Sequence, residues 1–176
     1  MRIKDVIIDV VIVAVVIVVF TTFIKPIIVD GDSMNPTLKD RDYLFLSRLA
    51  YKTGEPQRGQ IVVFPPPNAP DELYIKRVVG LPGETVEIRG GEVYVNGVRQ
   101  DQSFTKDGYT GAGIDAAVSR EGRIKVPKGE LFVMGDNRNN SEDSRFIGCI
   151  KISDVKGVAV LRLWPLNKFG TLKKEP

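Results

Sequence analysis

A serine and a lysine carry the most chemical information in this chain, because it contains no histidine. Ser33 lies in Val-Asp-Gly-Asp-Ser-Met-Asn-Pro-Thr-Leu, and Lys76 lies in Leu-Tyr-Ile-Lys-Arg-Val-Val-Gly. Without histidine, neither a Ser-His-Asp triad nor a histidine-ligated metal site can form. If Ser33 is a nucleophile, a neutral lysine is the best remaining proton acceptor, and Ser-Lys pairs are a known variant of the triad.

Lys76 has apolar and aromatic neighbours within residues 74–79, which read as a β-strand. Burial disfavours an ammonium and lowers its pKa by up to ~3–5 units when burial is complete. An amine freed in this way can act as a general base near neutral pH. Arg77 cannot take this role, because a guanidinium does not deprotonate in proteins. The alternative interpretation is a surface lysine that keeps its charge.

The residues before Ser33 alternate as on an extended strand, with Ile27, Val29 and Gly31 on the same face as the serine. A peptide could lie along such an edge and place alternate side chains in shallow apolar pockets. Pro36 then turns the chain. Taken alone, this stretch is equally well explained as a glycine-containing turn with a polar serine in it.

A polar segment, residues 135–148, lies between two apolar runs and contains Asp136, Ser141, Asp143 and Arg145. Its position favours a buried polar network over a solvated loop, and such a network must be fully hydrogen-bonded. The spacing lacks the glycine and the terminal glutamate of an EF-hand loop, so we expect no metal here.

Composition limits the remaining possibilities. The 176 residues fit one domain, with room for a small subdomain. The net charge of +3 is spread along the chain, which argues against nucleic acid as a partner and is compatible with anionic lipid. Cys149 is the single cysteine, so an intramolecular disulfide and a thiol-metal cluster are both excluded. Its apolar neighbours predict a small core residue.

Residues 6–24 are apolar except for Asp9. Nineteen helical residues span about 28 Å, close to the ~30 Å hydrocarbon thickness of a bilayer. We therefore predict a single transmembrane anchor over residues 6–25, in preference to a cleavable signal peptide or a buried core element. The positive charge before the span favours an orientation in the cell membrane with residues 1–5 in the cytoplasm and the rest of the chain, after the span, outside.

From residue 26 the pattern becomes that of a mostly β protein. Residues 85–89 and 92–95 read as a hairpin around Gly90-Gly91. Residues 39–51 could hold a short helix, and residues 100–123 read as a long surface loop or part of a small second lobe. Other short β-branched or aromatic runs are 61–64, 93–95, 131–134 and 158–164.

Four stretches, at residues 31–38, 58–64, 74–83 and 135–145, carry recognisable motifs. Together they resemble the type I signal peptidases of family S26, the membrane-bound Ser/Lys leader peptidases. The short length and single anchor are similar to the Gram-positive-type enzymes. The resemblance implies a β-rich catalytic core over residues 26–176, with a smaller inserted lobe at about 90–130.

The resemblance also implies the roles of individual residues. Ser33 would be the nucleophile, with its backbone N–H as an oxyanion donor, and Lys76 the general base, oriented by Ser141. Asp143 and Arg145 would form a salt bridge that holds the loop, and Asp136 would belong to the same structural network. Relatives that add an oxyanion hydroxyl carry it two residues before the serine, where this chain has Gly31. No cofactor is implied.

The expected partners are membrane lipid and secreted preproteins with small residues at positions −1 and −3 of the cleavage site. These side chains would enter shallow pockets formed by Ile27, Val29, Gly31, Leu38, Tyr74 and Ile75. Two rival hypotheses are a self-cleaving Ser/Lys repressor and a membrane-anchored β-domain that binds peptides without cutting them. The first would need a DNA-binding module where the anchor lies, and the presence of both Ser33 and Lys76 argues against the second.

Overall fold

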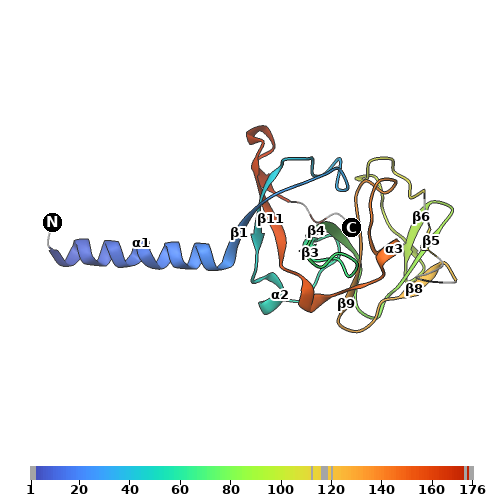
Figure 1. The fold of residues 1–176 in the computed structure, drawn as a ribbon, viewed down its shortest axis with the longest axis horizontal. Coiled ribbons are helices and arrows are strands. Elements are labelled where there is room, and N and C mark those ends of the chain that lie inside the picture. The colour runs from blue at the N-terminus through green and yellow to red at the C-terminus, as the bar shows by residue number, and fades with distance from the viewer. Residues whose placement is uncertain (1–2, 112, 116–118, 120, 173, 175–176) are drawn as a thin grey trace.

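The computed structural model describes residues 3–111, 113–115, 119, 121–172 and 174. Within helices, the side chains at 16, 17, 19–22, 52 and 53 also lie outside the described residues. The remainder form a helix that projects from a mostly β body (Figure 1).

Helix α1, Ile3–Phe23, ends where the first strand, β1, begins at Ile24. The predicted anchor extended to residue 25, so its last two residues are strand rather than helix. The cause is Pro26, which disfavours helical geometry at the residue before it and lacks an N–H. In the part of the chain described with side chains, no helix is both long and apolar enough to cross a membrane.

The larger sheet has eight strands among the described residues, in the order β1-β2-β11-β3-β4-β9-β10, with β12 paired to β11. Its antiparallel ladders place β4 in the interior of the sheet, between β3 and β9. The bounds are β1 Ile24–Ile28, β2 Tyr43–Ser47, β3 Ile61–Phe64, β4 Tyr74–Gly80, β9 Glu130–Met134, β10 Ile150–Lys151, β11 Gly157–Trp164 and β12 Gly170–Thr171.

A smaller sheet, in the order β7-β6-β5-β8, lies to one side of the larger one (Figure 1). Its strands are β5 Thr85–Arg89, β6 Glu92–Val95, β7 Val98–Arg99 and β8 Arg123–Lys125. The predicted hairpin is confirmed, because β5 pairs with β6 around two glycines with positive φ. Short helices complete the fold: α2 Ala50–Thr53, α3 Ser144–Ile147, η1 Ile152–Asp154 and η2 Leu166–Lys168.

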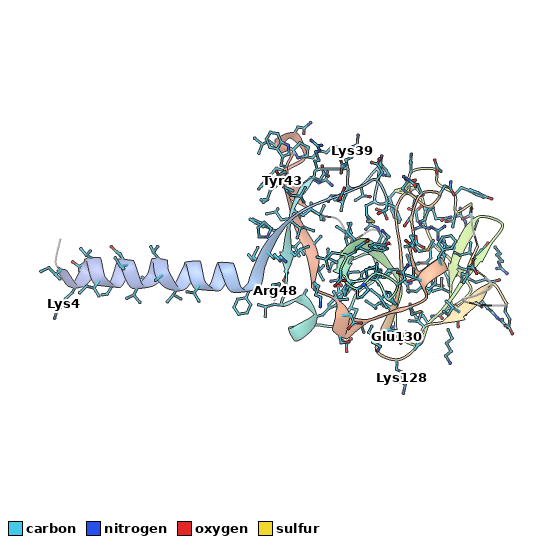
Figure 2. The ribbon with its side chains drawn as sticks, viewed as in Figure 1. Lys4, Lys39, Tyr43, Arg48, Lys128 and Glu130 are labelled. Atoms are coloured by element: carbon cyan, nitrogen blue, oxygen red, sulfur yellow. The ribbon has the colours of Figure 1, made fainter. Side chains whose placement is uncertain are left out.

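Residues 39–51 could hold a short helix, and the structure has one only at the end of this range, where α2 begins at Ala50. Residues 43–47 form β2 instead, with Leu44 and Leu46 buried while Tyr43 stays exposed. The spacing of two between the leucines is the period of a strand, and it places both in the core. Figure 2 shows Tyr43 at the edge of the body, near the tip of the β11–β12 connection.

The core is divided into clusters on the two faces of the larger sheet and beneath the smaller one. Strand β4 is buried at every position after Tyr74, so its lysine and arginine are both enclosed. The described residues between β7 and β8 form no helix or strand, yet this segment is more than a surface loop. Gln102, Thr105 and Thr110 are buried in it.

Candidate active site

Ser33 lies in a turn that follows β1. Strand β1 stops at Ile28, and the chain then folds back so that the Val29 N–H donates to the Asp42 carbonyl at 2.9 Å. Gly31 has φ +86°, which breaks the extended alternation expected up to Ser33. The loop therefore presents the serine from a compact turn and not from a straight strand.

Lys76 reaches Ser33 from β4, with its Nζ donating to the serine Oγ at 2.8 Å. The lysine is only 4% exposed. Burial lowers the pKa of its amine from 10.5 to about 8, since an ammonium loses hydration in the interior. Asp143 and Glu142 oppose this by raising the pKa, and Arg145 lowers it further.

The ring of Tyr74 lies on the same face of β4, with the Lys76 Nζ 5.0 Å from its centroid. Its hydroxyl donates to Glu142 Oε2 at 2.8 Å. This hydrogen bond is the largest cause that raises the pKa of Tyr74 to about 12. Asn68 Nδ2 donates to the other oxygen of Glu142 at 2.9 Å. These contacts join β4 to the segment that follows β9.

That segment begins with Gly135, which lies directly against the serine turn. A Cβ at this position would come within 2.4 Å of the Ser33 carbonyl oxygen and 2.3 Å of Ser141 Oγ. The Asn137 N–H donates to the Ser33 carbonyl at 3.0 Å, and its side chain donates to the Asp32 carbonyl at 3.1 Å. The two loops are therefore held together by hydrogen bonds from Asn137 to the backbone carbonyls of the nucleophile and of the residue before it.

Two ion pairs without solvent exposure hold the segment. Arg145 Nε lies 2.8 Å from Asp143 Oδ1, and Asp143 Oδ2 also accepts from the Gly135 N–H. Arg77 Nη2 lies 2.6 Å from Asp136 Oδ2, and Arg77 Nε donates to the other oxygen, so this pair is bidentate. All four side chains are 0% exposed. Buried charges are tolerated when paired and hydrogen-bonded in this way.

The sequence reasoning missed the positions of Arg77 and Asn137. It considered Arg77 only as a competing base, whereas the structure gives it Asp136, the Gly59 carbonyl at 2.8 Å and the ring of Phe104 at 4.8 Å. An arginine within an otherwise apolar strand was the available signal, because a buried arginine needs an acidic partner. Nothing in the local pattern around Asn137 indicated its bonds to the serine turn.

Arg138 is also buried, and burial lowers its pKa to about 10. Its guanidinium donates to Gln102 Oε1 at 2.8 Å and to Thr110 Oγ1 at 3.1 Å. These bonds tie the irregular segment after β7 to the catalytic side of the molecule.

Ser141 lies in the same cleft wall as Ser33 and Lys76. Its Oγ is buried and has no hydrogen-bond partner among the described residues, so the expected bond to Lys76 is not formed here. A buried hydroxyl without a partner is costly, which makes this atom a candidate for contact with a bound peptide or with a rotated amine.

These residues open onto a cleft of about 540 Å³. Of the residues expected to bind substrate, Ile27, Val29, Tyr74 and Ile75 line it. Leu38 lies in the core beneath the cleft and is fully buried, and Gly31 belongs to the adjoining turn. The other lining residues are Ile28, Asp30, Ser33, Val63, Glu72, Leu73, Lys76, Asn140, Ser141 and Glu142.

Metal and thiol chemistry find little support in the described part of the chain. No group of three histidine, cysteine or acidic side chains there could hold a metal ion. Cys149 is a partly buried free thiol that packs against the core beneath the smaller sheet, and burial raises its pKa to about 12. A thiol so rarely ionised is a poor nucleophile.

Comparison with known proteins gives a consistent result. A family profile described as "Signal peptidase, peptidase S26" matches residues 3–164. Signal peptidase I of Leptolyngbya laminosa is 38% identical over 155 residues, which cover 84% of this chain and 72% of the relative. Signal peptidase I S of Bacillus subtilis strain 168 is 39% identical over 148 residues, covering 82% and 79%. The crystal structure of a signal peptidase I from Enterococcus faecalis V583 is 35% identical with a TM-score of 0.50, covering 59% of this chain and 96% of that chain.

Proposed function

The chain belongs to the peptidase S26 family of signal peptidases, and we propose that it cleaves preproteins with Ser33 as nucleophile and Lys76 as general base. It is a type I signal peptidase, a serine endopeptidase. The observation that carries the proposed roles is the 2.8 Å contact between the Lys76 Nζ and the Ser33 Oγ beside an open cleft.

The lowered pKa of Lys76 makes the base step feasible. With a pKa of about 8, about a tenth of the amine is neutral at pH 7. That amine accepts the Ser33 hydroxyl proton as Oγ attacks the scissile carbonyl carbon. The resulting ammonium returns the proton to the leaving amine nitrogen, which produces the acyl-enzyme. The neutral lysine then takes a proton from water, whose oxygen attacks the ester, and the ammonium returns that proton to Ser33 Oγ as the bond between the acyl carbon and Oγ breaks.

The backbone N–H of Ser33 is the proposed donor to the oxyanion. Gly31 supplies no side-chain hydroxyl, and its φ of +86° is a conformation that other residues rarely adopt. A serine at this position would therefore be strained, so this chain relies on backbone groups.

We assign Ser141, Asp143, Arg145 and Asp136 to positioning. The unpartnered Ser141 hydroxyl can pair with the Lys76 amine once the amine turns from Ser33 during acylation. The two buried ion pairs hold the segment that carries Ser141 against the serine turn.

The substrate is an extended preprotein segment with small side chains at positions −1 and −3. The cleft supports this proposal because Ile27, Val29, Tyr74 and Ile75 give it apolar walls beside Ser33. Glycine, alanine and serine side chains suit such shallow surfaces, whereas a large side chain would hold the scissile carbonyl away from the serine.

We further propose that α1 anchors the enzyme in the cell membrane, with residues 1–5 inside and residues 26–176 outside. Support comes from the exposed apolar side chains on the described part of α1, such as Ile7, Val11 and Val15. The helix projects from the body, and Lys4 lies at its far end (Figure 2). The smaller lobe, which we propose at about residues 90–130, overlaps in sequence with the smaller sheet formed by β5, β6, β7 and β8.

The test is cleavage of a fluorogenic small-x-small peptide by the full chain in detergent. Ser33→Ala and Lys76→Ala should each reduce kcat/KM by at least about a thousandfold. Lys128→Ala is the matched control and should cleave normally, because Lys128 is exposed at the surface between β8 and β9 (Figure 2) and does not line the cleft. Cleavage retained by either active-site variant would reject the dyad.

A further inference from the structure

Glu142 occupies a place in the cleft for which the cleavage mechanism gives no reason. Its two carboxylate oxygens accept from different elements, Oε2 from the Tyr74 hydroxyl and Oε1 from Asn68 Nδ2. It thereby connects the start of β4, the proline-rich loop at 65–70 and the segment that carries Ser141. No ion pair links it to a cation among the described side chains.

Tyr74 is fixed at both ends by these contacts. The edge of its ring meets Phe64 with centroids 6.4 Å apart and planes at 68°, and its hydroxyl is held by Glu142. The Lys76 Nζ lies 5.0 Å from the centroid of the same ring. The position of the aromatic face beneath the amine therefore depends on Glu142.

We propose that Glu142 is a positioning residue that fixes the Tyr74 ring beneath the Lys76 amine and that its negative charge, held near this amine, opposes deprotonation of the amine. The inference rests on the proposed function, in which Lys76 is the base. Its physical basis is that both the ring face and the carboxylate favour an ammonium over a neutral amine.

The charges that face Lys76 come from one segment. Asp143 and Arg145 have opposite signs and opposite effects on the amine, and they are paired with each other. Glu142 raises the pKa of Lys76 and has no such compensating partner among the described residues. Ser33, Ser141 and Tyr74 beside the amine are uncharged, and the other acidic residues that line the cleft are Asp30 and Glu72. Neutralising Glu142 should therefore make the amine easier to deprotonate, so that the acidic limb of the pH profile moves to lower pH.

Two variants separate the charge from the geometry. Glu142→Gln keeps an oxygen that can accept from the Tyr74 hydroxyl while it removes the charge. Tyr74→Phe keeps the ring and the charge while it removes the hydrogen bond that fixes the ring. Because the pKa of Tyr74 is raised to about 12, its hydroxyl stays a donor throughout an assay between pH 6 and pH 10.

The experiment measures kcat/KM of the full chain in detergent from pH 6 to pH 10, with the small-x-small peptide, at low and at 1 M salt. In Glu142→Gln we expect the acidic limb to move down by about half a unit, so that activity at pH 7 rises about threefold. This shift should shrink at 1 M salt, where the Debye length is about 3 Å. In Tyr74→Phe the limb should stay within about 0.2 units while kcat falls several-fold.

Glu87→Gln, in the smaller sheet, is the control and should leave the profile unchanged. An unchanged limb in Glu142→Gln, or a shift that is equal at both salt concentrations, would overturn the inference. A failure of the proposed function would look different, because Lys76→Ala would then still cleave the peptide.

Discussion

Replacing Lys76 by methionine should abolish cleavage and yet stabilise the folded enzyme near neutral pH. The pKa of the amine is 10.5 in an unfolded chain and about 8 in the fold, where burial is the main cause. Each pKa unit corresponds to about 1.4 kcal/mol. Burial of this amine therefore lowers the free energy of unfolding at pH 7 by about 3 kcal/mol. Methionine has a similar length and no charge, which removes the cost. The lost contacts with Ser33 and the Tyr74 ring offset about 1 kcal/mol of the gain.

The stability difference between Lys76→Met and the wild-type protein should depend on pH. Between the two pKa values the unfolded chain binds the proton more strongly, so the stability of the wild-type protein rises with pH. The advantage of Lys76→Met should therefore fall from about 2 kcal/mol at pH 7 to near zero at pH 9.5.

Urea unfolding in detergent at pH 7, 8 and 9.5, followed by tryptophan fluorescence, measures this difference. Lys128→Met replaces an exposed lysine and should show no comparable dependence on pH. A Lys76→Met variant whose stability difference from wild type is the same at all three pH values would show that the amine is not desolvated, and the argument for a neutral base would fail.

Two further substitutions test the contacts that hold the site. Gly135→Ala should lower kcat/KM by about a hundredfold, because its Cβ would lie 2.4 Å from the Ser33 carbonyl oxygen. Gly113→Ala, with open space around its Cβ, should cleave normally, and equal activity of the two variants would contradict the expectation. Asp136→Asn should reduce the free energy of unfolding by about 3–5 kcal/mol in urea, because it leaves the Arg77 charge buried without its partner. A loss below about 1 kcal/mol would show that the pair is not the main support of the segment.

The pairing of Ser33 with Lys76 could be predicted because it depends on chemistry more than on geometry. A chain without histidine leaves few groups that can take a proton from serine, and a lysine in an apolar strand is one of them. The 2.8 Å contact joins residues 43 positions apart. The bond between Tyr74 and Glu142 could not be predicted in this way, because it depends on how the start of β4 meets the segment after β9.

Local sequence patterns predicted the elements whose conformation is set by residues close in the sequence. The Gly90-Gly91 hairpin and the strand at 61–64 follow from turn chemistry and β-branched residues. The prediction that the chain stays extended up to Ser33 was wrong, because the alternation of Ile27 and Val29 gave no sign that Gly31 would take a positive φ. Burial of the segment after β7 also depends on a distant residue, Arg138, which local sequence cannot reveal.

A Ser/Lys site has to solve a problem that a histidine-based site does not face. An imidazole is largely neutral at pH 7 without help, whereas a lysine must be buried, and any unbalanced carboxylate near it restores the ammonium. The segment beside Lys76 nevertheless needs charged hydrogen bonds to stay in place. Closed pairs such as Asp143–Arg145 meet both needs, because Asp143 binds the backbone at Gly135 while the opposite charges of the pair, both 0% exposed, act on the amine in opposite directions. By the same reasoning, a substitution that removes Arg145 alone should harm catalysis through the pKa of the base as well as through the fold.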